Sequence, residues 1–174
     1  MSKVKVSSDF LYARLMDHDI IISMIATRMG VSKSIVRDCF QHRLNRHGKP
    51  LKFSQANIAR LNTAIGQIAK ELRECLIPFG SNQTFTNQWG KVYDPGVMPA
   101  FNKIASYFNM TALTNRLLGW KKSKRNTVFC VSSGIYGHVT KEDVDSINAE
   151  LLAVAGILES IEVVADDDAK PVSV

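Results

Sequence analysis

Lysine and arginine side chains concentrate in two stretches of this chain that contain no acid. The first stretch, residues 39–70, carries Arg43, Arg46, Lys49, Lys52, Arg60 and Lys70. The second, residues 95–141, carries Lys103, Arg116, Lys121, Lys122, Lys124, Arg125 and Lys141. Cations gathered without neutralising acids attract phosphate groups, and the formal net charge of +6 agrees with an anionic partner. The two stretches therefore indicate nucleic-acid binding; a solvated basic surface without a partner is the alternative.

The residue types that support catalysis do not come together in the sequence. The four histidines are not spaced as metal ligands; they are His18, His42, His47 and His138. No combination of Ser, His and acid, no glycine-rich phosphate loop and no paired-carboxylate site stands out. We therefore expect no enzyme activity, no cofactor and no metal site. We expect the three cysteines to be buried, reduced thiols; they are Cys39, Cys75 and Cys130.

Residues 25–37, just before the first basic stretch, predict two short helices that meet at a sharp turn. Ile25, Ala26 and Met29 form an apolar stripe at helical spacing. Gly30 can end that helix in the left-handed conformation, and Ser32 is a good N-cap for the next one. The second helix is expected to carry three residues inward, namely Ile35, Val36 and Cys39.

This pattern resembles the helix-turn-helix family of DNA-binding proteins, including phage-repressor-like regulators. The residues that fall on the family pattern are Ile25, Ala26, Met29, Gly30, Val31, Val36 and Cys39. In that family, exposed residues at the start of the second helix read base edges, and flanking cations hold phosphates. The resemblance thus implies base-reading positions at Ser32, Lys33, Ser34, Arg37 and Gln41. It implies phosphate contacts from Arg43, Arg46 and Lys49. Arg37 suits guanine and Gln41 suits adenine.

A similar pattern recurs in residues 104–116, which follow the first at a distance of 79 residues. Asn109 takes the place of Gly30, and Asn is the next residue most tolerant of the left-handed conformation. The corresponding DNA-contacting positions are Thr111, Ala112, Thr114, Asn115 and Arg116. Cations that follow them are Lys121, Lys122, Lys124 and Arg125.

A later segment is also repeated, with a spacing of 86 residues. Residues 54–62 match residues 140–148, and further on Ala69 and Leu72 match Ala155 and Leu158. We interpret the two matches as an internal duplication of a module of roughly seventy residues. Chance similarity between helical stretches is the alternative.

The sequence therefore predicts a mainly helical fold with short β-hairpin or extended segments, built as two tandem helix-turn-helix modules. Residues 1–78 form the first module, and residues 79–96 form a linker or a degenerate first helix. Residues 97–164 form the second module, and residues 165–174 form an acidic tail. Long helices are expected from residue 55 to about 76 and from 141 to about 164, with a capping box at Thr140 and Asp143. Strands are expected at 51–53 and, as a hairpin or wing, within 126–139.

We predict a sequence-specific double-stranded DNA-binding protein, a transcriptional regulator of phage or mobile-element type. The alternative is a structural or assembly protein, such as a phage packaging component or a helical scaffold. A recombination accessory protein is a third possibility. The expected partner is double-stranded DNA, with no membrane and no evident small-molecule effector. We expect a monomer acting as a pseudo-dimer, with a homo-oligomer as the alternative.

Two further expectations concern location and the roles of the two modules. The chain contains no apolar run of eighteen residues and no signal-peptide core, so the default location is the host cytosol or nucleoid. The first module carries the larger positive charge. We therefore expect it to supply most of the phosphate affinity, and the second module to add selectivity.

Overall fold

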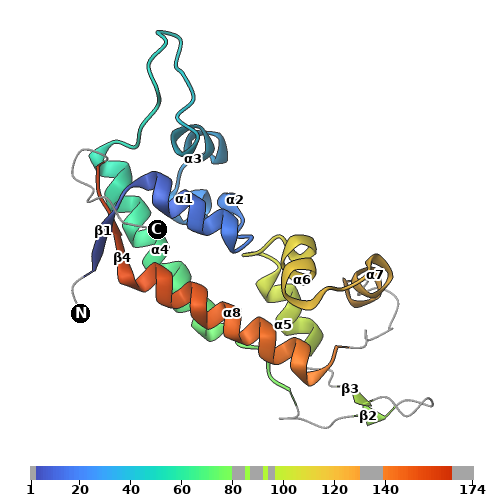
Figure 1. Ribbon diagram of the computed structural model, residues 1–174. Coiled ribbons are helices and arrows are strands. Elements are labelled where there is room, and N and C mark those ends of the chain that lie inside the picture. The colour runs from blue at the N-terminus through green and yellow to red at the C-terminus, as the bar shows by residue number, and fades with distance from the viewer. Residues whose placement is uncertain (1–2, 80–84, 87–91, 94–96, 130–138, 166–174) are drawn as a thin grey trace. The chain divides into compact units, whose positions relative to one another are not determined.

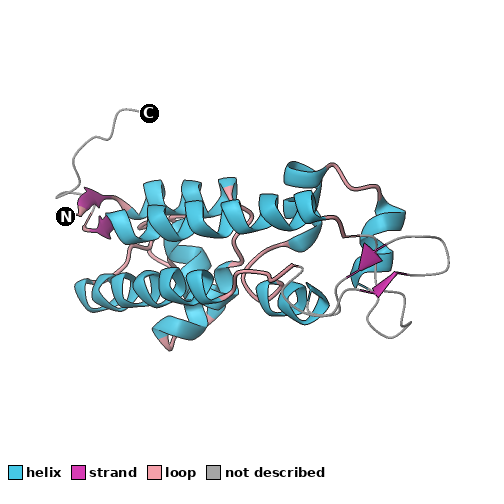
Figure 2. Ribbon diagram, turned by 90° about the horizontal axis from the view of Figure 1, so that it is seen from below, coloured by secondary structure: helices cyan, strands magenta, loops and turns pink. Residues whose placement is uncertain are grey.

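The structure is a computed structural model that describes residues 3–79, 85–86, 92–93, 97–129 and 139–165 (Figure 1). The described part of the chain is mostly helical, with only short strands, as Figure 2 shows, so the predicted fold class is confirmed. The helices are α1 (Ser8–Asp17), α2 (Ile22–Met29), α3 (Lys33–Phe40), α4 (Gln55–Glu74), α5 (Val97–Ile104), α6 (Met110–Leu118), α7 (Lys122–Phe129) and α8 (Lys141–Ser160). The strands are β1 (Val4–Val6), β2 (Phe85–Thr86), β3 (Val92–Tyr93) and β4 (Ile161–Val163).

The chain forms two compact units that do not follow simple sequence order. Unit 1 contains residues 1–71 and 154–174, and unit 2 contains residues 72–153. Helices α4 and α8 therefore each contribute residues to both units. The sequence-based boundaries divide the chain once, around residues 79–96, and did not anticipate this discontinuous division.

Unit 1 is held together by an apolar core and by a strand pair from distant parts of the chain. Strand β1 pairs in parallel with β4, with Val4 opposite Ile161 and Val6 opposite Val163. Side chains with no exposure include Val6, Leu11, Ile25, Val36, Leu61 and Ile65. The expected last helix to about residue 164 is wrong at its end, because residues 161–163 form this strand.

The turn between α2 and α3 follows the prediction in its backbone. Gly30 adopts the left-handed conformation with φ of 67°, and the backbone N–H of Val31 donates to the carbonyl of Ala26. Ser32 caps α3 and accepts a hydrogen bond from the backbone N–H of Ile35. The prediction that the Ile35 side chain points inward is wrong, because that side chain is 48% exposed. Val36, Cys39 and Phe40 form the buried face of α3 instead.

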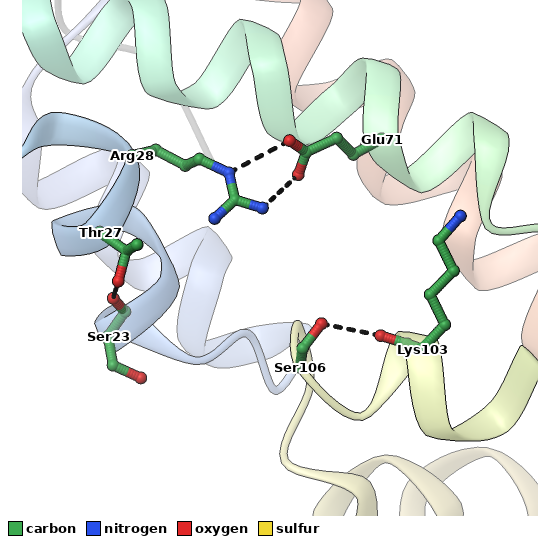
Figure 3. Close-up of polar contacts among 6 residues, drawn as sticks. All are labelled: Ser23, Thr27, Arg28, Glu71, Lys103 and Ser106. Atoms are coloured by element: carbon green, nitrogen blue, oxygen red, sulfur yellow. Dashed lines mark hydrogen bonds and ion pairs between the residues drawn. The ribbon is translucent and has the colours of Figure 1, made fainter. Parts of the chain in front are cut away.

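An ion pair fixes α2 against α4 within unit 1. Arg28 Nε lies 3.1 Å from one carboxylate oxygen of Glu71, and Arg28 Nη2 lies 2.7 Å from the other (Figure 3). This two-point geometry constrains the guanidinium in direction as well as in distance. Because α2 carries the turn into α3, the pair also limits the placement of α3.

Unit 2 corrects the register of the second predicted motif. Asn109 has φ of −70° and caps α6 with its side chain, so the expected left-handed turn at Asn109 is wrong. The left-handed residue is Gly119, with φ of 58°, at the end of α6. Helix α5 instead ends in a longer turn, in which the Ser106 hydroxyl donates to the Lys103 carbonyl at 2.7 Å (Figure 3).

The α6–α7 pair shares its turn pattern with the α2–α3 pair. In both, a left-handed glycine is followed by two residues and then by a helix of eight residues, α3 or α7. The two eight-residue helices both begin with Lys-Ser and end with Phe, 89 residues apart. The expected strand over residues 126–129 is wrong, because these residues are helical; residues 130–138 lie outside the described part. The expected strand at 51–53 is also absent, although Leu44 and Pro50 form a single bridge nearby.

The left-handed glycine gives a test of the turn. A Cβ at Gly30 meets no atom within 4 Å, and the same holds at Gly66 inside α4. Of these two glycines, Gly30 has positive φ and Gly66 does not. Gly30→Ala should therefore lower the free energy of unfolding by about 1–2 kcal/mol. Gly66→Ala, the matched control, should raise it by about 0.5–1 kcal/mol. Urea unfolding of both variants measures the difference, and equal effects would contradict the turn geometry.

Candidate nucleic-acid interface

The N-terminal end of α3 presents small polar and cationic groups to solvent. Ser32, Lys33 and Ser34 are exposed, and the hydroxyls of Ser32 and Ser34 lie 3.0 Å apart. The first N–H groups of a helix have no carbonyl partner in the helix and carry partial positive charge. Together with the Lys33 ammonium, these N–H groups at the start of α3 can donate hydrogen bonds to an anionic oxygen.

One acid organises two arginines along the rest of α3 and just beyond it. Asp38 Oδ1 lies 3.5 Å from Arg37 Nε and 3.4 Å from Arg43 Nε. The Asp38 side chain is the least exposed of the three, so it holds both guanidinium groups at the edge of the surface. Two cations share one anion, and the cluster keeps a net positive charge. Burial, followed by the charge of Asp38, raises the pKa of Cys39, which keeps this buried cysteine a thiol.

The segment after α3 is a turn that displays further cations. The side-chain carbonyl of Asn45 accepts hydrogen bonds from the backbone N–H groups of His47 and Lys49, at 2.8 and 3.1 Å. Arg43 precedes this turn and Arg46 and Lys49 lie on it, and all three side chains are exposed. Gln41 is also exposed, and its amide donates to the Tyr12 hydroxyl at 3.4 Å. Every site residue predicted in the first module thus lies on α3 or on the segments that flank it.

Residues 111–116 lie on α6, which ends at the left-handed Gly119 as α2 ends at the left-handed Gly30. Thr111, Asn115 and Arg116 are exposed, and Ala112 is half-buried. Thr114 has no exposure and its hydroxyl donates to the Met110 carbonyl at 2.7 Å, so its predicted role in contacting DNA is wrong. Arg116 Nη2 lies 2.7 Å from a carboxylate oxygen of Glu150, which directs that cation toward α8.

The four cations that follow lie at the start of α7, and they divide into two pairs. Lys121 and Lys122 are exposed at the N-terminal end of the helix. Lys124 binds Asp143 at 3.0 Å and lies 4.7 Å from the centre of the Trp120 ring. Arg125 Nη1 donates to the side chain of Asn115 and to the Trp120 carbonyl. The first pair can meet an anion directly, whereas the second pair is engaged within unit 2.

Asp143 is the centre of this internal network, and sequence reasoning found only part of its role. Its carboxylate accepts from the backbone N–H of Thr140, while the Thr140 hydroxyl accepts from the Asp143 N–H, which confirms the predicted capping box. The indole N–H of Trp120 donates to Asp143 at 3.1 Å, and the Lys124 ammonium donates at 3.0 Å. The local Thr-x-x-Asp signal could not reveal partners that lie about twenty residues earlier.

Corresponding positions of α3 and α7 therefore carry different chemistry. When the sequences of α3 and α7 are aligned with a spacing of 89 residues, Ile35 aligns with Lys124 and Val36 with Arg125. In α3 the first of these is exposed and the second is core. In α7 both are long cations bound to groups of unit 2. Sequence reasoning assigned Ile35 to the core and so missed an apolar side chain on the outer face of α3.

Asp143 predicts a pH dependence of stability. Burial alone would raise its pKa, but the hydrogen bonds from Thr140, Lys124 and Trp120, with the charge of Lys124, lower the pKa below its usual value. A lowered pKa in the folded state contributes stability above the unfolded-state pKa of about 3.9, which is lost as the pH falls through the folded-state pKa. Asp143→Asn should therefore cost about 1–3 kcal/mol at pH 7, and less as the pH falls below 4.

The matched control is Asp145→Asn, which removes an exposed carboxylate that pairs with Lys141 one turn away. Urea unfolding between pH 3 and pH 7 measures both variants, and the control should change little throughout. A pH-independent loss in Asp143→Asn would show that its charge is unimportant.

No protein-family model, no curated protein and no solved structure matches this chain. Within the described ranges, no helix combines the length and the apolar character needed to cross a membrane. In those same ranges, no three His, Cys, Asp or Glu side chains gather as metal ligands would.

Proposed function

We propose that this chain binds double-stranded DNA in a sequence-specific way and acts as a transcriptional regulator. The observation that carries the proposal is the repeated helix, left-handed glycine turn and helix, at α2–α3 and at α6–α7. In each case the second helix begins with exposed lysine and serine side chains, which fit a phosphate or a base edge. This arrangement resembles that of helix-turn-helix DNA-binding proteins.

The cations around α3 support backbone binding beside a base-reading surface. Arg43, Arg46 and Lys49 project from the turn after α3, and each can hold a phosphate oxygen. Arg37, held at the surface by Asp38, retains part of its guanidinium for a guanine edge. Phosphate contacts would fix the position of α3, and its outer face would then read the sequence.

The two units are suited to different tasks. The outer face of α3 offers a hydroxyl at Ser34, an apolar group at Ile35 and a guanidinium at Arg37. The corresponding face of α7 has Lys124 and Arg125 engaged in unit 2, while Lys121 and Lys122 face solvent. We therefore assign base reading to unit 1 and backbone binding to unit 2. This reverses the division of labour expected from net charge alone.

The second candidate function is a structural or assembly protein that uses these helices for protein contacts. Two exposed apolar side chains favour it, Ile35 at 48% and Leu44 at 68% exposure. A protein interface usually excludes charge from its centre, whereas Lys33, Arg37 and Arg43 surround these side chains in sequence. The positive charge makes DNA the better-supported partner.

DNA binding should depend strongly on salt. About six phosphate contacts from the two units predict an affinity loss of about 10³-fold between 50 and 200 mM salt. Lys33→Ala and Lys122→Ala should each lower the slope of log affinity against log salt by about 1. Lys5→Ala, an exposed lysine on β1, is the control and should leave the slope unchanged. A flat salt response would favour the assembly protein.

We expect the exposed side chain of Ile35 to contact a thymine methyl group in the bound DNA. The bound sequence is first selected from a random duplex pool, and each thymine is then replaced by uracil, which lacks only the 5-methyl group. Burial of one methyl group contributes about 0.8 kcal/mol, so one position should lose roughly fourfold in affinity. Ile35→Ala should show the same loss on the thymine site and no further loss on the uracil site.

Ser34→Ala is the neighbouring control, and it should remain sensitive to uracil at the same position. Tight binding without sensitivity to uracil at any position would remove the role of Ile35 and leave DNA binding intact. Absence of salt-dependent binding to any duplex would remove the proposed function itself.

A further inference from the structure

Two asparagines bind the backbone of distant segments in the same way. The Asn62 side-chain amide on α4 donates to the Val163 carbonyl at 2.8 Å, and its oxygen accepts from the Val163 N–H at 2.8 Å. The Asn148 side chain on α8 donates to the Ile77 carbonyl at 2.9 Å and accepts from the Ile77 N–H at 2.7 Å. Each amide therefore satisfies both polar groups of one backbone residue.

These two contacts are related by the internal repeat. Asn148 follows Asn62 by 86 residues, and Val163 follows Ile77 by the same 86 residues. The helix that carries each asparagine is twenty residues long, and the caps Ser54 and Thr140 also lie 86 residues apart. A chance resemblance between two helices would not reproduce a pair of contacts at a second, separate place in the sequence.

The bound segments, which we call the arms, also match in side-chain burial. Residues 161–163 are buried, exposed and buried in turn, and residues 75–77 show the same alternation. Six matched pairs of buried side chains precede the arms on α4 and α8: Ile58 and Val144, Leu61 and Ile147, Ile65 and Leu151, Ile68 and Val154, Ala69 and Ala155, Leu72 and Leu158. We call the asparagine side chain that binds each arm, Asn62 or Asn148, the clamp. The two repeats therefore share a long helix, a clamp and an arm.

The repeats exchange these arms. Asn62 belongs to the first repeat, but the arm that it binds in unit 1 follows α8 of the second repeat. Asn148 belongs to the second repeat, but the arm that it binds in unit 2 follows α4 of the first. Unit 1 is thus completed by residues from 154 onward, which come from the second repeat, and unit 2 by residues from 72 to the end of the first repeat.

We propose that the arm-binding surfaces at Asn62 and Asn148 are a duplicated docking site whose partner is the arm of another copy of the same module. In this protein the two modules are joined covalently, so the single polypeptide contains both members of the arm-exchanged pair. The ligand that such a site accepts is a short extended backbone with apolar side chains at alternate positions. Recognition uses a backbone N–H and C=O together with two buried side chains, here Ile161 and Val163.

If the exchanged arms hold the two repeats together, the repeats should stay associated without the covalent link between them. Binding of the first arm to its site would keep the second arm near its own site at high effective concentration. The two halves should therefore remain together when the chain is cut between them. This expectation does not depend on DNA binding.

The test uses the full chain with a protease recognition sequence inserted between Phe79 and Phe85. After cleavage, the two fragments should elute together at the size of the uncleaved protein and keep its helical circular dichroism. They should separate only in denaturant and should combine again when it is removed. Elution of two separately folded fragments under native conditions would overturn the proposal, as would unfolding on cleavage with no recovery on mixing.

Variants of the clamp identify its contribution. Asn62→Ala and Asn148→Ala should each weaken the association of the cleaved fragments at least roughly tenfold, because each leaves a backbone N–H and C=O without their partner. Asn102→Ala changes an exposed asparagine on α5 and should have no effect. Fragments that associate equally well in all three variants would show that the clamps are not the docking site.

Discussion

The left-handed glycine that ends α2, and its counterpart at the end of α6, is the constraint on which the rest of the arrangement depends. Only a residue without a Cβ takes this conformation at low cost, and it lets the next helix begin after two further residues. The turn sets which side of α3 is buried, and so which side chains remain outside. A shift of one residue would move Val36 outward and Ile35 inward. The buried and exposed sides of α3 therefore depend on the backbone conformation of Gly30.

Single acids determine what the basic surfaces can do. Asp38 and Asp143 each serve two partners, but with different results. Asp38 lies beside the outer face of α3 and holds two arginines where a partner can reach them. Asp143 lies at the start of α8 and draws a lysine and an indole inward. The two acids thus leave different cations at the surface: both arginines of Asp38 remain partly exposed beside α3, whereas Lys124 is engaged with Asp143 inside unit 2.

The sequence predicted the helical class, the first turn and the capping of α3 and α8, because these follow from local spacing and cap residues. It placed the second motif wrongly because Asn109 suits both a left-handed turn and a helix cap, and only packing decides between them. It assigned Ile35 to the core because apolar spacing alone cannot separate neighbouring positions on a short helix. The partners of Asn62 and Arg28 could not be predicted, since they lie far along the chain and depend on the packed structure.

The pairing of β1 with β4 has a consequence for synthesis. Val4 pairs with Ile161, which is synthesised about 160 residues later. At usual rates of translation this delay is on the order of ten seconds. Until then the first strand has an unpaired edge, and α4 has an asparagine amide without the backbone that it binds. Unit 1 therefore completes its folding after nearly all of the described chain has been made.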